Sequence, residues 1–113
     1  MTSALALRWA AAFAVTQAVE APIYAYALRG RPRRWAWALA LSAVTHPVVF
    51  FAFPRLWPGG WLHQTLAAEA FAVAVEGALL SRLGVARSLA WALLANGASV
   101  AVGLTARHLW GWP

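Results

Sequence analysis

Four long apolar stretches account for most of this chain. They cover about residues 9–28, 35–53, 63–81 and 88–108, and each has roughly the 20 residues that a helix needs to cross about 30 Å of hydrocarbon. Hydrophobic residues make up 63% of the sequence, well above the roughly half-apolar composition of soluble domains. We therefore expect an all-α membrane protein, with residues 1–113 forming a single integral membrane domain of four transmembrane helices in an antiparallel bundle.

The connections between these stretches are short and carry most of the positive charge. Proline and glycine interrupt residues 29–34, 54–60 and 82–87, which predicts tight turns. Six of the nine arginines lie in the first and third connections: Arg29, Arg31, Arg33, Arg34, Arg82 and Arg87. The positive-inside rule then places these connections in the cytoplasm. This predicts a multi-pass protein of a bacterial-type inner (plasma) membrane, with both termini outside the cytoplasm.

Composition narrows the expected partners. The net charge of +6 is explained by topology and by attraction to anionic headgroups of the lipid bilayer, so nucleic-acid binding is not expected. Most of the eight tryptophans lie near the ends of the apolar stretches, as interfacial anchors do. Because the chain contains no cysteine, disulfides and thiolate metal sites are excluded.

The two halves of the chain resemble each other. Ala18-Val19-Glu20-Ala21 recurs as Ala74-Val75-Glu76-Gly77, and Trp37-Ala38-Leu39 recurs as Trp91-Ala92-Leu93. These matches suggest two similar helical hairpins in parallel orientation, an arrangement that places a binding site between the halves. Alanine-rich sequence also produces such matches by chance, so both interpretations stay open at this point.

All three acidic residues, Glu20, Glu69 and Glu76, lie inside the apolar stretches. A charged side chain in hydrocarbon costs a few kcal/mol even on the gentler insertion scales, so each acid needs a partner or a function. Counting about 1.5 Å per residue from the inner arginines places Glu20 and Asn96 at one level near the midplane. The same count pairs His46 with Glu69 in the outer half and puts Glu76 closer to the inner surface.

Polar neighbours extend this predicted site. Glu69 and Glu76 are seven residues apart and share a helix face, whereas Glu76 could instead pair with Arg82 near the interface. Pro22 and Pro47 lie beside polar positions and should kink their helices. The predicted ligand-binding or proton-binding residues are Glu20, Tyr24, Thr45, His46, Glu69, Glu76, Asn96 and Ser99. Of these, Glu20, His46 and Glu69 are the predicted ligands if the cofactor is a divalent metal cation.

Three functions are compatible with this pattern. The first is transport, by a cation-binding or proton-binding carboxylate, histidine and asparagine centre in the membrane. The second is an accessory or assembly subunit whose polar residues bond to a larger membrane complex. The third is a membrane enzyme acting on a lipid, although no catalytic motif is present and no catalytic residue is assigned. Because four helices enclose little volume, we expect a homo-oligomer or a larger complex.

In length, in four predicted helices and in a carboxylate on the first of them, the chain resembles the small multidrug resistance transporters. That resemblance implies that Glu20, with Tyr24 one turn later, exchanges protons for cationic substrates. Glu69 and Glu76 have no counterpart in the pattern of those transporters. The chain is also similar in size to small fluoride channels, whose phenylalanine and asparagine motifs it lacks, and we assign it to neither family.

Overall fold

The computed structural model describes residues 2–112, and this part of the chain is helical without any strand. The elements are α1 (Ser3–Ala27), α2 (Arg34–Pro47), the π-helical turn η1 (Val48–Ala52), α3 (Phe53–Leu56), α4 (Trp61–Arg82) and α5 (Ser88–Trp110). The prediction of an all-α chain with four long helical segments is therefore confirmed over these residues.

The first helix begins earlier than we predicted. α1 starts at Ser3 rather than near residue 9, because the Thr2 hydroxyl caps it by accepting a hydrogen bond from the Leu5 backbone N–H at 3.1 Å. A side-chain cap of this kind satisfies one of the free amides at a helix start. The helix then passes through Pro22 without a break.

The second helical segment changes from an α-helix to a wider π-helical turn after Pro47. Pro47 has no N–H to donate to the carbonyl of Ala43, and the chain continues as the wider turn η1 before α3 ends at Leu56. Single π-turns of this kind are a recognised cause of helix bending. α2, η1 and α3 together form one continuous helical segment, Arg34–Leu56.

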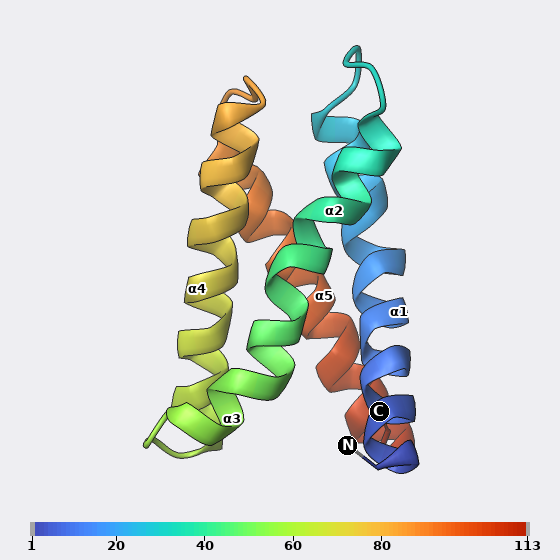
Figure 1. The fold of residues 1–113 in the computed structure, drawn as a ribbon, viewed down its shortest axis with the longest axis vertical. Helices are drawn as coiled ribbons and strands as arrows, with labels where there is room; N and C mark the ends of the chain where they lie inside the picture. Colours follow the sequence, from blue (N-terminus) through green and yellow to red (C-terminus); the bar gives the residue numbers. More distant parts are fainter. Residues whose placement is uncertain (1, 113) are drawn as a thin grey trace.

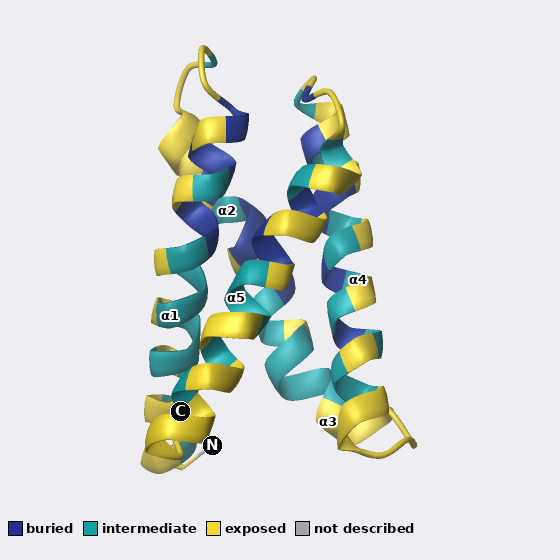
Figure 2. Ribbon diagram, turned by 180° about the vertical axis from the view of Figure 1, so that it is seen from behind, coloured by how far each residue is buried: buried dark blue, intermediate teal, exposed yellow. Residues whose placement is uncertain are grey.

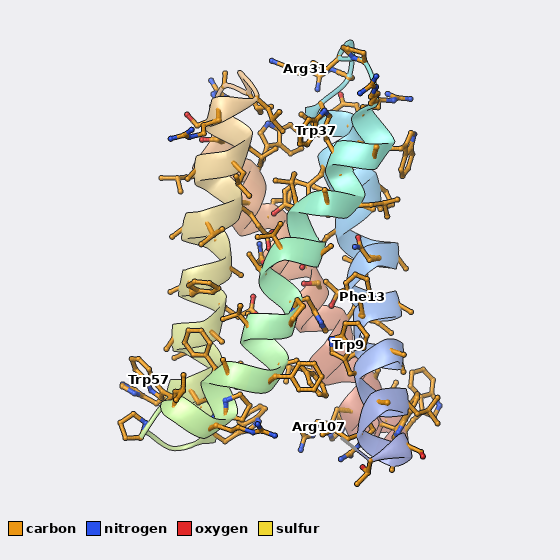
Figure 3. The ribbon with its side chains drawn as sticks, viewed as in Figure 1. Trp9, Phe13, Arg31, Trp37, Trp57 and Arg107 are labelled. Atoms are coloured by element: carbon orange, nitrogen blue, oxygen red, sulfur yellow. The ribbon has the colours of Figure 1, made fainter. Side chains whose placement is uncertain are left out.

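The four long segments lie side by side, with the α1–α2 and α4–α5 connections at one end and both termini at the other (Figure 1). We call α1 with the Arg34–Leu56 segment the first hairpin, and α4 with α5 the second. The two arginine-rich connections thus share an end of the molecule. Arg31 lies at that end, whereas Trp57 and Arg107 lie at the opposite one (Figure 3).

Small residues let the helices pack closely in the half of the molecule next to the arginine-rich connections, where buried residues gather (Figure 2). The core includes Ala21, Tyr24, Ala25, Leu28, Leu41, Leu80, Ala92 and Ala95. At Gly77 a Cβ atom would lie 2.7 Å from Cδ2 of Leu89, so glycine lets α4 approach this side chain of α5 closely.

The outer surface is apolar, and the interior holds polar groups. Leu7, Leu66 and Leu93 are each at least 60% exposed, whereas Glu20 and Glu76 are almost completely buried. Soluble proteins show the reverse distribution for charged residues. Two segments, Arg34–Leu56 and Ser88–Trp110, are long and apolar enough to cross a membrane.

Candidate functional site: a buried acid centre

Side chains from all four long segments meet in a buried polar network, which we call the acid centre. Its members are Glu20 and Tyr24 from α1, Ser42 and Thr45 from α2, Glu76 from α4, and Asn96 and Ser99 from α5. Ser99 is half-buried and the other six are buried. Hydrogen bonds join both hairpins at this level, so the network links the whole bundle.

Glu20 accepts one hydrogen bond on each carboxyl oxygen. The Ser42 hydroxyl donates to Oε1 at 2.6 Å, and the Ser99 hydroxyl donates to Oε2 at 2.5 Å. We expected Glu20 to share its level with Asn96, but its partner on α5 is Ser99, one turn further along the helix. One carboxyl group thereby bridges α1, α2 and α5.

Glu76 has the most partners of the three acids. Oε1 accepts hydrogen bonds from the Tyr24 hydroxyl and from Nδ2 of Asn96 at 3.0 Å, and Oε2 accepts one from the Thr45 hydroxyl. Three donors directed at one carboxyl group suit a carboxylate, which can accept about four hydrogen bonds. The prediction that Glu76 lies near the inner interface, within reach of Arg82, is wrong, since the side chain is 1% exposed and bonds to this network.

The two hairpins present their polar side chains in the same arrangement. Each carboxyl group accepts one hydrogen bond from the second helix of its own hairpin: Glu20 from Ser42, and Glu76 from Asn96. Each also accepts a hydrogen bond from the second helix of the other hairpin: Glu20 from Ser99, and Glu76 from Thr45. Ser99 lies three residues after Asn96, and Thr45 lies three residues after Ser42. Ser42 and Asn96 are 54 residues apart in the sequence, as are Thr45 and Ser99.

The backbone of the two connections repeats with the same 54-residue separation. Gly30 and Gly84 both have φ of 84°, and Arg33 and Arg87 have φ of 58° and 55°. Left-handed conformations are uncommon for arginine, so their recurrence at equivalent positions is a specific similarity. Backbone and hydrogen bonds thus agree with the parallel repeat suggested by the sequence.

A cavity of about 120 Å³ lies against the acid centre. Its walls include seven of the eight residues predicted to bind a ligand or proton: Glu20, Thr45, His46, Glu69, Glu76, Asn96 and Ser99. The eighth, Tyr24, lies behind them and bonds to Glu76. This volume holds a few waters or a partly hydrated small cation, and it is smaller than the roughly 300 Å³ at which pockets for drug-sized ligands begin.

Glu69 and His46 line this cavity together, and no hydrogen bond joins them. Oε2 of Glu69 and Nδ1 of His46 are both buried without a hydrogen-bond partner in the described part of the chain. The His46 ring packs instead against aromatic rings of Phe13 at 5.3 Å, Phe50 at 6.1 Å and Trp9 at 6.4 Å between centroids. Trp9 and Phe13 lie next to each other on α1 (Figure 3), so Trp9 contributes to this packing and is more than an interfacial anchor.

The predicted metal ligands are not assembled into a metal site. Over residues 2–112, no three histidine, aspartate or glutamate side chains are grouped so that they could hold a metal ion. Glu20, His46 and Glu69 line one cavity, but the His46 ring is enclosed by aromatic side chains and Glu20 is bonded to two serines. The oxygen-rich wall formed by the acids, Thr45 and Asn96 is better suited to a hard cation than to a metal that prefers nitrogen.

The cavity adjoins a second hollow that leads toward the end of the molecule with the termini. This hollow of about 190 Å³ shares Thr16, Ser99 and Val100 with the first, and its walls extend to Gly103 and Arg107. On the other side, fully buried Leu28, Leu41 and Leu80 of the core separate the acid centre from the arginine-rich end.

Comparisons with known proteins give no independent indication of function. No family model matches the chain, and neither a curated protein nor a solved structure matches it. The function of the acid centre therefore has to be inferred from its own chemistry.

Proposed function

We propose that the chain is a small integral membrane protein with four transmembrane helices in an antiparallel bundle, and that it resides in an inner (plasma) membrane. The exposed leucines and the buried carboxyl groups support this proposal, because this distribution suits hydrocarbon as the solvent. The gathering of six arginines in two connections at one end supports an orientation with that end in the cytoplasm and the termini outside.

The acid centre, in this proposal, binds protons or a small cation and serves their transport. The observation that carries the proposal is that all three acidic residues of the chain, Glu20, Glu69 and Glu76, line one cavity. Glu20 and Glu76 belong to one hydrogen-bonded network, and Glu69 lines the same cavity. Three desolvated negative charges would repel one another strongly at low dielectric, and this repulsion favours protonation of the carboxyl groups or binding of a cation in the cavity.

The available ligand atoms favour a hard cation that competes with protons. No three acidic or histidine side chains of residues 2–112 are grouped so that they could hold a metal ion by themselves. A cation here would therefore also need the Thr45 and Ser99 hydroxyls and the Asn96 amide oxygen, which are ligands of the kind preferred by alkali and alkaline-earth ions. Tyr24 and Asn96 hold Glu76 in place, so its oxygens are preorganised. Because a cation binds only to deprotonated carboxyl groups, its binding releases protons and weakens as the pH falls.

Transport requires access from each side in turn. The cavity adjoins a hollow directed to the terminal end and is closed by core residues toward the arginine-rich end, which corresponds to a state with access directed outward. In transporters built from two similar halves, alternating access arises when one half rocks against the other around a central site. The hydrogen bonds that cross between the hairpins, such as Ser99 to Glu20 and Thr45 to Glu76, would have to rearrange in this motion.

Flux measurements in proteoliposomes test this proposal. The purified chain is reconstituted with a pH-sensitive dye inside, and gradients of individual alkali and alkaline-earth cations are applied. We expect a coupled pH change for at least one cation, and we expect Glu76→Gln to abolish it while the exposed control His108→Gln retains it. Proteoliposomes that show no more proton or cation movement than empty liposomes, under every gradient, would contradict the proposal.

A second candidate function is that of a subunit in a larger membrane assembly. It is favoured by an apolar groove of about 510 Å³ between α4 and α5, whose walls include Leu66, Ala70, Ala74, Leu93 and Gly97. Small residues on a helix face permit close packing of another transmembrane helix, from a second copy or from a different protein. If the isolated chain unfolds readily in detergent and coexpression with a partner stabilises it, this function is favoured over independent transport.

A further inference from the structure

A hollow at the arginine-rich end lies between the two connections and has no role in the acid centre. It encloses about 440 Å³, and its walls include Arg29, Arg31, Arg87 and Trp91. We call it the arginine hollow. Three arginines from two separate connections thus contribute to the wall of one space.

Arg31 is fixed in position by the connection that it faces. Its Nε donates to the Leu83 carbonyl at 2.9 Å and its Nη2 donates to the Gly84 carbonyl at 2.6 Å. A guanidinium group has five N–H donors, so three remain for a ligand after these bonds form. Because the two bonds hold the group in place, little side-chain entropy is lost when a ligand binds.

Arg29 and Arg87 complete the wall from different directions. Arg29 donates to the Tyr26 carbonyl at 3.0 Å and lies 4.3 Å above the centre of the Tyr26 ring, which leaves most of its donors free. Arg87 is exposed and has a left-handed backbone, with φ of 55°. Arg33 has the same conformation at the equivalent position of the other connection, with φ of 58°, so the conformation belongs to the repeated turn.

The charge of the hollow is not compensated by neighbouring acids. Neither connection contains an aspartate or glutamate, and all three glutamates line the distant acid-centre cavity. α5 begins at Ser88 with no side-chain cap and no acidic residue in its first turn, so the positive end of its helix dipole adds to the local potential.

We propose that the arginine hollow binds a phosphate group. Guanidinium groups match phosphate oxygens through paired, charge-assisted hydrogen bonds, and three of them around one space suit a tetrahedral anion better than a planar carboxylate. The phosphate is either free or part of an anionic lipid headgroup, since both share this chemistry. Ligand binding would join the two connections, and this site is independent of ion binding at the acid centre.

Two probes and two variants test this site in the full-length chain. The probes are inorganic phosphate, titrated into protein in a zwitterionic detergent, and phosphatidylglycerol, titrated as increasing fractions of phosphatidylcholine nanodiscs. Arg87→Gln removes the positive charge and the guanidinium donors of one lining residue. Arg55→Gln is the matched control because Arg55 is an exposed arginine at the opposite end. Arg31 is left unchanged because its bonds to Leu83 and Gly84 stabilise the fold.

We expect the wild type to bind at least one probe. The affinity should be about tenfold or more weaker in Arg87→Gln, because one charge-assisted contact is lost, and the affinity of Arg55→Gln should equal that of the wild type. Binding of inorganic phosphate identifies the free anion as a ligand, whereas binding of phosphatidylglycerol alone identifies the lipid headgroup. Equal affinities for the two variants, or no binding of either probe by the wild type, would overturn the proposal. Circular dichroism of Arg87→Gln checks that the variant remains helical. Arg87→Lys should bind with intermediate affinity, because lysine keeps the positive charge but lacks the paired donors of a guanidinium group.

Discussion

The substitution Tyr24→Phe tests the acid centre most selectively, because it removes one hydroxyl and leaves the ring. Tyr24 is completely buried and its hydroxyl donates to Oε1 of Glu76. Asn96 keeps two of its partners in the variant, namely Glu76 at 3.0 Å and the Ala92 carbonyl at 2.9 Å. The main loss is therefore a single hydrogen bond to a carboxyl group.

The size of the effect depends on the charge of Glu76. A hydrogen bond to a charged group contributes about 1.5–3 kcal/mol, whereas hydrogen bonds between helices in a membrane contribute about 0.6 kcal/mol on average. Since three donors surround Glu76, we expect the larger value, a loss of about 1.5–3 kcal/mol in the free energy of unfolding.

Unfolding of the reconstituted chain by a denaturing detergent measures this difference. Tyr26→Phe is the matched control, because Tyr26 is the only other tyrosine, lies on the same helix and is 58% exposed. A loss near 0.6 kcal/mol in Tyr24→Phe would indicate a bond to an uncharged Glu76. Equal stability of the two variants would refute the hydrogen-bond network around Glu76.

Three further predictions concern access, polarity and packing. Because the chain has no cysteine, Gly103→Cys in the hollow beside the acid centre should react with a membrane-impermeant thiol reagent applied from the terminal side, whereas the control Gly97→Cys on the apolar groove should not. Both positions have room for the new side chain, since neither glycine has an atom within 4 Å of an added Cβ. Equal labelling of the two variants would contradict access to the acid centre through this hollow. Glu69→Leu should abolish cation binding measured by proton release, because Glu69 lines the cavity; retained binding would remove Glu69 from the site. Gly97→Ala should raise the free energy of unfolding by about 0.5–1 kcal/mol through helix propensity, since an added Cβ meets no atom within 4 Å. Gly77→Ala should gain less, because its methyl group meets the end of the exposed Leu89 side chain, which can rotate away; a loss of more than about 2 kcal/mol in Gly77→Ala would contradict this.

Much of the fold could be predicted because each apolar stretch is long and bounded by arginine, proline or glycine. The exact start of α1 could not, since it depends on a single capping hydroxyl at Thr2. The bend after Pro47 was expected from the missing amide, but the choice of a π-helical turn depends on packing around Val48–Ala52 that no local pattern contains.

The residues that line the cavity could be predicted better than the hydrogen bonds that they form. Polar residues inside apolar helices turn toward one another, which places Glu69 and Asn96 on one cavity. Depth counted along a helix treats every helix as straight and equally tilted, and this made Glu76 appear peripheral. Its bonds to Tyr24 and Thr45 cross between hairpins, and a spacing rule within one helix gives no information about them.

Ser42 was the one member of the acid centre that the predicted site omitted. The signal that could have identified it is the repeat itself, because Ser42 precedes Asn96 by the same 54 residues that separate Trp37 from Trp91. When the second helices of the two hairpins are aligned, Ser42 falls at the position of Asn96. Hydropathy alone does not identify Ser42, because a serine hardly changes the mean hydropathy of an apolar helix.

Infrared difference spectroscopy of the reconstituted chain tests the central claim most directly. Its three glutamates are the only acidic side chains in the sequence, so side-chain carboxyl signals can arise only from Glu20, Glu69 and Glu76. We predict that the C=O band of protonated carboxyl groups decreases when the pH is raised or when a cation that binds the site is added. The triple variant Glu20→Gln, Glu69→Gln, Glu76→Gln should lose this response. Carboxyl bands that respond to neither pH nor any alkali or alkaline-earth cation would contradict the account.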